Sequence, residues 1–158
     1  MYRTVRDFTT DWSNAAKGTI QVLESLTDET LDQAIVEGHS TLGWLGWHIA
    51  TAPVFFTGFV GLEVKPSTEQ DEVPNKASVI LNTYKEISEQ VVSEVEKELT
   101  DEMLLEEVDS FGTSTPRGAL LRTLIDHQTH HRGQMTVLLR QAGLPVPGVM
   151  GPTQEDSK

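Results

Sequence analysis

Three of the chain's five histidines lie within five positions, at His127, His130 and His131. Imidazole rings exchange protons near neutral pH, and in their neutral form they are common ligands of divalent metals. His127 and His131 are four residues apart, so on a helix both rings lie on the same face, one turn apart. Such a pair is by itself more often structural than ligating, so its surroundings must be considered.

A helix expected over about residues 115–141 gives the three rings different surroundings. Its apolar stripe consists of Leu120, Leu121, Leu124, Ile125, Met135, Leu138, Leu139 and Ala142. At 100° per residue, His131 lies about 35° from the centre of this stripe, His127 about 75° and His130 about 135°. We therefore expect His131 to be buried, His127 to flank the core and His130 to face water or a partner.

A further histidine, His48, lies on the apolar face of another predicted helix. Buried imidazoles need partners for their ring nitrogens, and three of them in one place would repel one another if protonated. A divalent metal satisfies all three as neutral ligands and leaves one position open, as in catalytic sites. The sequence therefore predicts a metal site of His48, His127 and His131. Because the chain has no cysteine, zinc, nickel, iron and manganese all remain possible.

Three neighbours of these histidines carry expectations of their own. Gln128 lies near the centre of the stripe and needs a buried partner, either a ligand histidine or a group at a helix interface. Arg132 is expected to pair with an acidic side chain of a neighbouring helix. Gly133 is expected to let another helix approach closely, because glycine otherwise weakens a helix. No Asp or Glu lies on the core faces beside the histidines, so the sequence offers no evident general base.

Aromatic residues surround His48 in the sequence. Large aromatic side chains of this kind lie in the core more often than they line a pocket. The residues concerned are Trp44, Trp47, Phe55 and Phe59. If they line a pocket, we expect a substrate to lie between Trp44, Phe55 and the first predicted helix. His39 precedes the helix of His48 and is expected only in its capping region.

The spacing of apolar residues predicts four helices, over about residues 5–26, 41–60, 76–99 and 115–141. No segment alternates as a strand would, so the expected fold class is all-α. Residues 63–75 form a predicted polar loop, and a Pro/Gly-rich, partly irregular tail of residues 144–158 follows a single domain of residues 1–143. The sequence "LTDE" occurs twice, each time ahead of a histidine-bearing helix, which suggests two helical hairpins of one plan.

The composition excludes several classes of partner. Twelve Lys and Arg against 24 Asp and Glu give a formal net charge of −12, which argues against binding of nucleic acids or anionic membranes. Residues 38–62 carry no charge and are long enough to span a bilayer, but they include two histidines and a proline and lack flanking Lys/Arg clusters. We expect a buried helix there. The lack of cysteine and of a secretory signal favours a cytoplasmic location.

The chain resembles members of the DinB/YfiT-like superfamily. The resemblance lies in "STLGWLGWHIA" around His48, "LIDHQTHHRGQM" around His127 and His131, the two "LTDE" segments and the ending "LLRQAGLPVPG". It implies a four-helix bundle of up-down-down-up topology with a long crossover connection, often a homodimer. It also implies one divalent metal held by His48, His127 and His131, the same three residues that helical geometry selects.

For function, the resemblance implies several possibilities. Some members are similar to metal-dependent S-transferases that join a low-molecular-weight thiol of the bacillithiol type to an electrophile. We therefore expect a small-molecule substrate, with a metal-bound nucleophile in place of a catalytic side chain. The alternatives are a metal-dependent hydrolase at the same site, a non-enzymatic metal-binding stress-response protein, and a helical dimer without metal.

Overall fold

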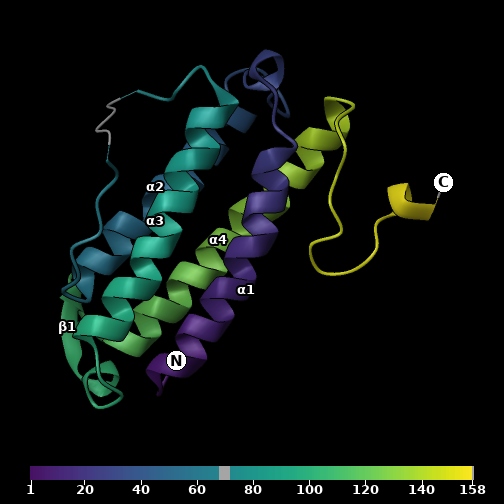
Figure 1. Ribbon diagram of the computed structural model, residues 1–158. Helices are drawn as coiled ribbons and strands as arrows, with labels where there is room; N and C mark the ends of the chain where they lie inside the picture. Colours follow the sequence, from purple (N-terminus) through teal and green to yellow (C-terminus); the bar gives the residue numbers. More distant parts are fainter. Residues whose placement is uncertain (68–71, 158) are drawn as a thin grey trace.

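Four long helices make up most of the computed structural model, which describes residues 1–67 and 72–157 (Figure 1). They are α1 (Val5–Glu24), α2 (Leu42–Phe59), α3 (Ala77–Glu98) and α4 (Arg117–Gln141). The four predicted helices are thus confirmed, with ends that differ by at most two residues. Residues 68–71 of the predicted polar loop and Lys158 of the predicted tail lie outside the described residues.

The helices lie side by side as a bundle. In Figure 1, α1 and α4 run upward and α2 and α3 run downward, so the connection between α2 and α3 has to cross the length of the bundle. Both α1 and α2 pack against α3 and α4. The helices α1 and α2 therefore occupy opposite corners, and His48 on α2 faces α4 as its neighbour.

Short side chains fix where the helices begin. The Thr4 hydroxyl accepts a hydrogen bond from the Asp7 amide at the start of α1, and Thr41 accepts one from Trp44 at the start of α2. The Asp28 carboxylate accepts from the Ala77 amide at the start of α3. Each "LTDE" segment leads into a 3₁₀ turn: η1 (Asp28–Thr30) after α1 and η2 (Met103–Leu105) after α3.

A β-hairpin precedes α4, so the expectation of a chain without strands is wrong. Strand β1 (Glu107–Ser110) pairs antiparallel with β2 (Thr113–Pro116), and Glu107 lies opposite Pro116. The predicted fourth helix began near Thr115, but Pro116 disfavours helical backbone in the residue before it. Thr115 is therefore extended, and α4 begins at Arg117.

Two apolar clusters fill the bundle, with polar side chains buried between the helices. One cluster includes Phe8, Trp12 and Leu121, and the other includes Leu23 and Met135. Buried polar residues include Thr19, Gln128 and Arg132.

The tail after α4 returns to the bundle. Val146 is buried, and Arg140 of α4 forms an ion pair at 2.7 Å with Glu155 of the short turn η3 (Gln154–Ser157). The tail is therefore packed on the bundle although most of it is irregular.

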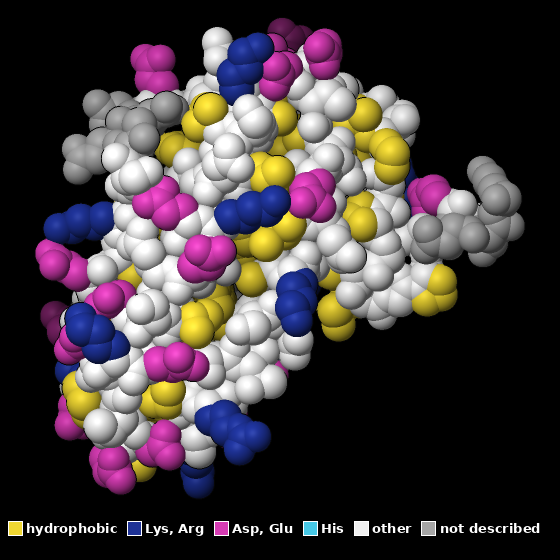
Figure 2. Space-filling model, in the orientation of Figure 1, with side chains coloured by type: hydrophobic (Ala, Val, Ile, Leu, Met, Phe, Trp, Pro, Cys, Tyr) yellow, Lys and Arg dark blue, Asp and Glu magenta, His cyan; other side chains and the backbone are white. Residues whose placement is uncertain are grey.

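Acidic and basic side chains are interspersed over the face shown in Figure 2, without a continuous basic patch. Among the described residues, no helix is both long and apolar enough to cross a membrane.

Candidate metal centre

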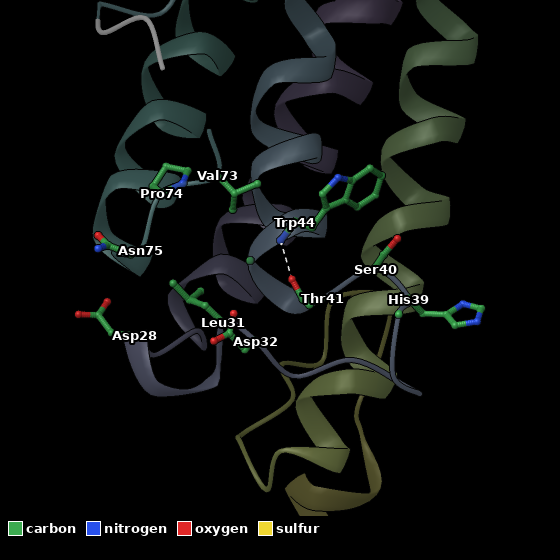
Figure 3. Close-up of a pocket in the computed structure, with 12 residues that line it drawn as sticks. Asp28, Leu31, Asp32, His39, Ser40, Thr41, Trp44, Val73, Pro74 and Asn75 are labelled. Atoms are coloured by element: carbon green, nitrogen blue, oxygen red, sulfur yellow. Dashed lines mark hydrogen bonds between the residues drawn. The ribbon is translucent and has the colours of Figure 1, made fainter. Parts of the chain in front are cut away.

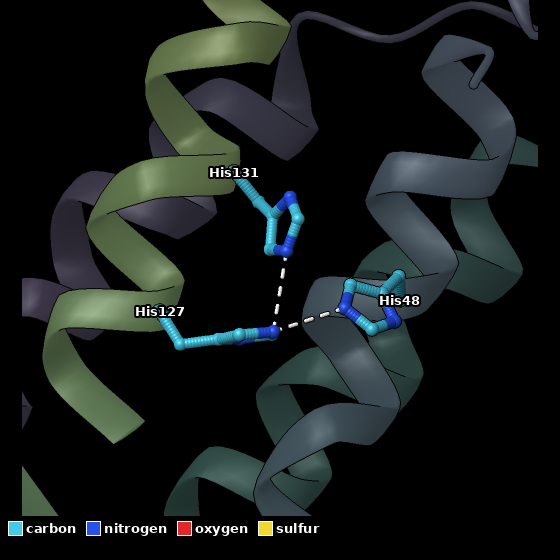
Figure 4. Close-up of side chains that lie close together, drawn as sticks. All are labelled: His48, His127 and His131. Atoms are coloured by element: carbon cyan, nitrogen blue, oxygen red, sulfur yellow. Dashed lines mark hydrogen bonds between the residues drawn. The ribbon is translucent and has the colours of Figure 1, made fainter. Parts of the chain in front are cut away.

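Helices α2 and α4 bring His48, His127 and His131 together although His48 is 79 positions away from His127 (Figure 4). The Nε2 atom of His127 lies 3.1 Å from Nε2 of His48 and 3.2 Å from Nε2 of His131. The potential ligand atoms of all three lie within 4.8 Å of one another. The convergence inferred from helical geometry is therefore present.

Hydrogen bonding among the rings cannot satisfy this arrangement. A ring nitrogen has either one N–H or one lone pair, so Nε2 of His127 can bond only one of its two neighbours at a time. Two nitrogens bound tetrahedrally to zinc at about 2.0–2.1 Å would lie about 3.3 Å apart, close to both observed separations. The three imidazoles therefore fit a divalent cation, and this group could hold one.

The three rings are half-buried, and His130 is exposed on the outer side of α4. The expectation that His131 is fully buried is wrong. The buried face of α4 passes through Gln128 and Arg132, which are 2 % and 5 % exposed, so His131 lies at the edge of this face along with His127. The cluster consequently lies at the margin of the bundle and remains accessible to small molecules.

Burial and repulsion from neighbouring rings favour the neutral form of His48 and His127, which is the form that a metal requires. Partial burial lowers the pKa of His48, and the nearby His131 lowers it further. Partial burial lowers the pKa of His127 to about 4, with contributions from His131, His48 and His130. At neutral pH, His127 is therefore ready to donate a lone pair without first losing a proton.

A glutamine that sequence reasoning missed orients one of the rings. Nδ1 of His131 lies 2.7 Å from Oε1 of Gln134, an oxygen that can only accept, so Nδ1 donates. This bond leaves the lone pair on Nε2, which points at the other two histidines. Gln134 lies three residues after His131 on α4. This spacing is the feature of the sequence from which their contact could have been predicted.

Gln128 is buried, but its partners are not histidines. Its Oε1 accepts hydrogen bonds from the Thr19 hydroxyl at 2.7 Å and the Tyr84 hydroxyl at 2.8 Å. Its Nε2 is buried and has no partner among the described residues. The residue joins α4 to α1 and α3 across the core. Burial raises the pKa of Tyr84 well above its usual value, so this hydroxyl remains a donor.

Two expectations for the next residues of α4 are wrong. Arg132 has no acidic partner among the described residues; its Nη1 donates to the Ala15 carbonyl at 3.0 Å and to the Thr19 hydroxyl at 3.2 Å. Burial lowers its pKa because no carboxylate offsets the cost of the buried charge. Gly133 is exposed, and a Cβ placed there would meet nothing within 4 Å among the described residues.

Four aromatic residues of α2 that were expected in the core are not fully buried, whereas Phe56 of the same helix is a core residue. Trp44 is 42 % exposed and Phe55 is 55 % exposed, whereas Trp47 and Phe59 are half-buried at the edge of the core. The Trp44 indole stacks on the His48 ring with centroids 4.8 Å apart and an angle of 11° between the planes. Trp44 therefore braces one of the three histidines.

A hollow lies beside Trp44, at the start of α2 (Figure 3). Its volume is about 550 Å³, and Asp28 and His39 are among the residues that line it. Asp28 is engaged by Lys76 and by the start of α3. His39 lies in the loop before α2 and is not part of the three-histidine group. This hollow therefore lies next to the candidate centre without sharing its histidines.

Comparison with known proteins agrees with this geometry. The sequence matches the DinB family over residues 1–158. The chain belongs to the DinB family. It is 41 % identical over 156 residues to YrdA of Bacillus subtilis (strain 168), a protein described as uncharacterized, and the match covers 99 % of this chain and 93 % of YrdA.

Solved structures of other members have the same fold. A DinB-like protein from Bacillus cereus ATCC 10987 is 43 % identical and superposes with a TM-score of 0.89, covering 94 % of this chain and 99 % of the other. The B. subtilis DinB-like protein YjoA superposes with a TM-score of 0.72, covering 92 % of this chain and 99 % of YjoA. At 21 % identity, YjoA indicates the fold alone.

Proposed function

We propose that this DinB-family protein binds one divalent metal ion through His48, His127 and His131 and joins a low-molecular-weight thiol of the bacillithiol type to an electrophile. The observation that carries the proposal is the convergence of the three imidazole nitrogens, which no set of hydrogen bonds among the rings can satisfy. The cation would be zinc, nickel, iron or manganese, all of which accept imidazole ligands.

The donor set favours a reactive centre over a purely structural one. Three neutral nitrogen ligands leave a position that is not taken by protein, whereas structural zinc sites are closed by four protein ligands. When bound, the cation supplies a positive charge that lowers the pKa of a thiol placed at that position. The half-buried histidines leave a path for such a molecule.

The surrounding side chains have supporting roles. Gln134 holds the His131 ring in the tautomer that presents its Nε2 lone pair, and Trp44 holds the His48 ring by stacking. Among the described residues, no carboxylate belongs to the three-histidine group. The thiol therefore loses its proton to solvent, and we assign no catalytic role to a side chain.

A metal-dependent hydrolase at the same site, and a non-enzymatic metal-binding stress protein, remain the alternatives. A homodimer also remains a prediction.

Metal content tests the first half of the proposal. Protein purified without a His-tag column should contain close to one metal ion per chain, as measured by elemental analysis. His131→Ala should abolish this content. His130→Ala should leave it nearly intact, because His130 contacts the His131 ring but is exposed and does not belong to the three-histidine group. Equal loss in the two variants would contradict the assignment of ligands.

Turnover tests the second half. The metal-loaded protein is incubated with bacillithiol and a monobromobimane-type electrophile, and formation of the thioether is compared with the rate without protein. A rate above background that disappears in His131→Ala supports the transferase. A stably folded, metal-loaded protein without thiol transfer would contradict the transferase, and hydrolysis of ester substrates would then favour the hydrolase.

A further inference from the structure

A pocket opens beside two of the three histidines, between α2 and the β-hairpin. Its volume is about 390 Å³, and its walls include His48, His127, Ala52, Phe55 and Phe111. Apart from the two histidines, none of the described residues that line it is ionisable, although the chain has a net charge of −12. Neither Trp44 nor any described residue of α1 lines it, so this pocket differs from the expected position between Trp44, Phe55 and the first helix, which stays a prediction.

An aromatic cluster forms the outer wall of this pocket. Phe111 at the tip of the hairpin contacts Phe59 with ring centroids 4.9 Å apart and Phe55 with centroids 5.6 Å apart. Phe55 and Phe59 contact each other at 4.8 Å. Phe111 nevertheless remains 66 % exposed and Phe55 55 % exposed. Two large rings next to the candidate centre thus keep much of their apolar surface uncovered, which a ligand could cover.

The backbone at Phe111 is costly for a phenylalanine. Its φ is +53° and that of Gly112 is +76°, the left-handed pair of a two-residue hairpin turn. Asn-Gly is the usual pair in such a turn, and bulky residues rarely adopt a positive φ. The conformation of the turn therefore does not explain why a phenylalanine occurs at this position. The contact of its ring with the pocket does explain it.

We propose that this aromatic pocket binds an uncharged aromatic or branched apolar group of a small molecule and that Phe111 is a residue that determines specificity. Identifying that molecule as the electrophile rests on the proposed transferase function. The volume lies within the range of small-molecule pockets, and the lack of charged walls disfavours anionic or cationic substituents, whose desolvation would not be repaid. The hairpin places Phe111 over α2, so its ring sets the width of the pocket.

A binding measurement tests the pocket without requiring turnover. Benzyl alcohol is titrated into the full chain, with and without zinc, and the Ala52 methyl resonance is followed by NMR. The key variant is Phe111→Asn, because asparagine suits the turn and removes the ring. Leu105→Asn is the matched control, since Leu105 is also an exposed apolar residue, 54 % exposed, but lies on η2 outside the pocket. Phe55→Ala is a second pocket variant, which removes a lining ring from α2 and leaves the sequence of the hairpin unchanged.

We expect benzyl alcohol to shift the Ala52 resonance and 1-propanol to do so far more weakly. Phe111→Asn and Phe55→Ala should each weaken benzyl alcohol binding by about tenfold, because each removes much of a ring's apolar contact, and Leu105→Asn should not change it. Unchanged affinity in both pocket variants, or no shift of Ala52 in the wild-type protein, would overturn the proposal. If the metal-free protein binds benzyl alcohol and the metal-loaded protein shows no thiol transfer, the proposed transferase function is contradicted and the proposed binding pocket is supported.

Discussion

Among single residues, Gln134 orients a candidate metal ligand although it is exposed. It is exposed on α4, yet its amide oxygen accepts the only hydrogen bond that fixes the tautomer of His131 among the described residues. His127 and His48 contact other rings instead, so their orientation depends on stacking and burial. Outer-shell groups of this kind tune metal affinity without touching the metal.

We predict that Gln134→Leu weakens metal binding by roughly 10- to 100-fold while the fold is retained. The reason is that Nδ1 of His131 loses its acceptor, so the ring is free to rotate or to place its proton on Nε2. Isothermal titration with zinc measures the change. Gln141→Leu is the matched control, because Gln141 is an exposed glutamine at the end of the same helix. Equal affinity in the wild-type protein and Gln134→Leu would show that packing alone fixes the ring.

Among the elements, α2 and α4 supply the candidate metal ligands, and the hairpin supplies a wall of the neighbouring pocket. The periodicity of apolar residues was sufficient for the four helices and for the face of α4 that carries His127 and His131. It was not sufficient for the hairpin, because strands of four residues give too few positions to show alternation and Phe111-Gly112 is not a typical turn pair. The exposure of Trp44 and Phe55 could not be predicted either. It depends on how α2 and α4 approach each other, not on either helix alone.

Two glycines of α4 lead to opposite predictions. We expect Gly133→Ala to raise the free energy of unfolding by about 1 kcal/mol, because Gly133 is an exposed helical position with free space around it. Gly118→Ala should lower it by about 1–3 kcal/mol, because the new methyl group would collide with the Tyr2 carbonyl oxygen. Urea denaturation followed by circular dichroism measures both. A loss of stability in Gly133→Ala would indicate a partner that packs on this face of α4.

At the scale of the whole molecule, the candidate metal would link two helices that are far apart in the sequence. The core already joins α2 and α4 through buried apolar residues such as Leu45 and Leu138, so we do not expect the protein to unfold when the metal is removed. A ligand that binds only the folded state stabilises it by an amount set by its concentration relative to its dissociation constant. The metal should therefore add to a fold that exists without it.

We predict a zinc-dependent rise in the melting temperature that requires His131. At a free zinc concentration 100-fold above the dissociation constant, the gain is about 2.7 kcal/mol, which for a chain of 158 residues corresponds to roughly 5–10 °C. Calorimetry in EDTA and in buffered zinc measures the difference, and His131→Ala should lose it while His130→Ala keeps it. Since His130 contacts the His131 ring but is not one of the three grouped histidines, a similar rise in all three proteins would mean that zinc binds elsewhere. An identical melting temperature with and without zinc would instead mean that the three imidazoles are held by packing, and the proposed metal centre would have to be abandoned.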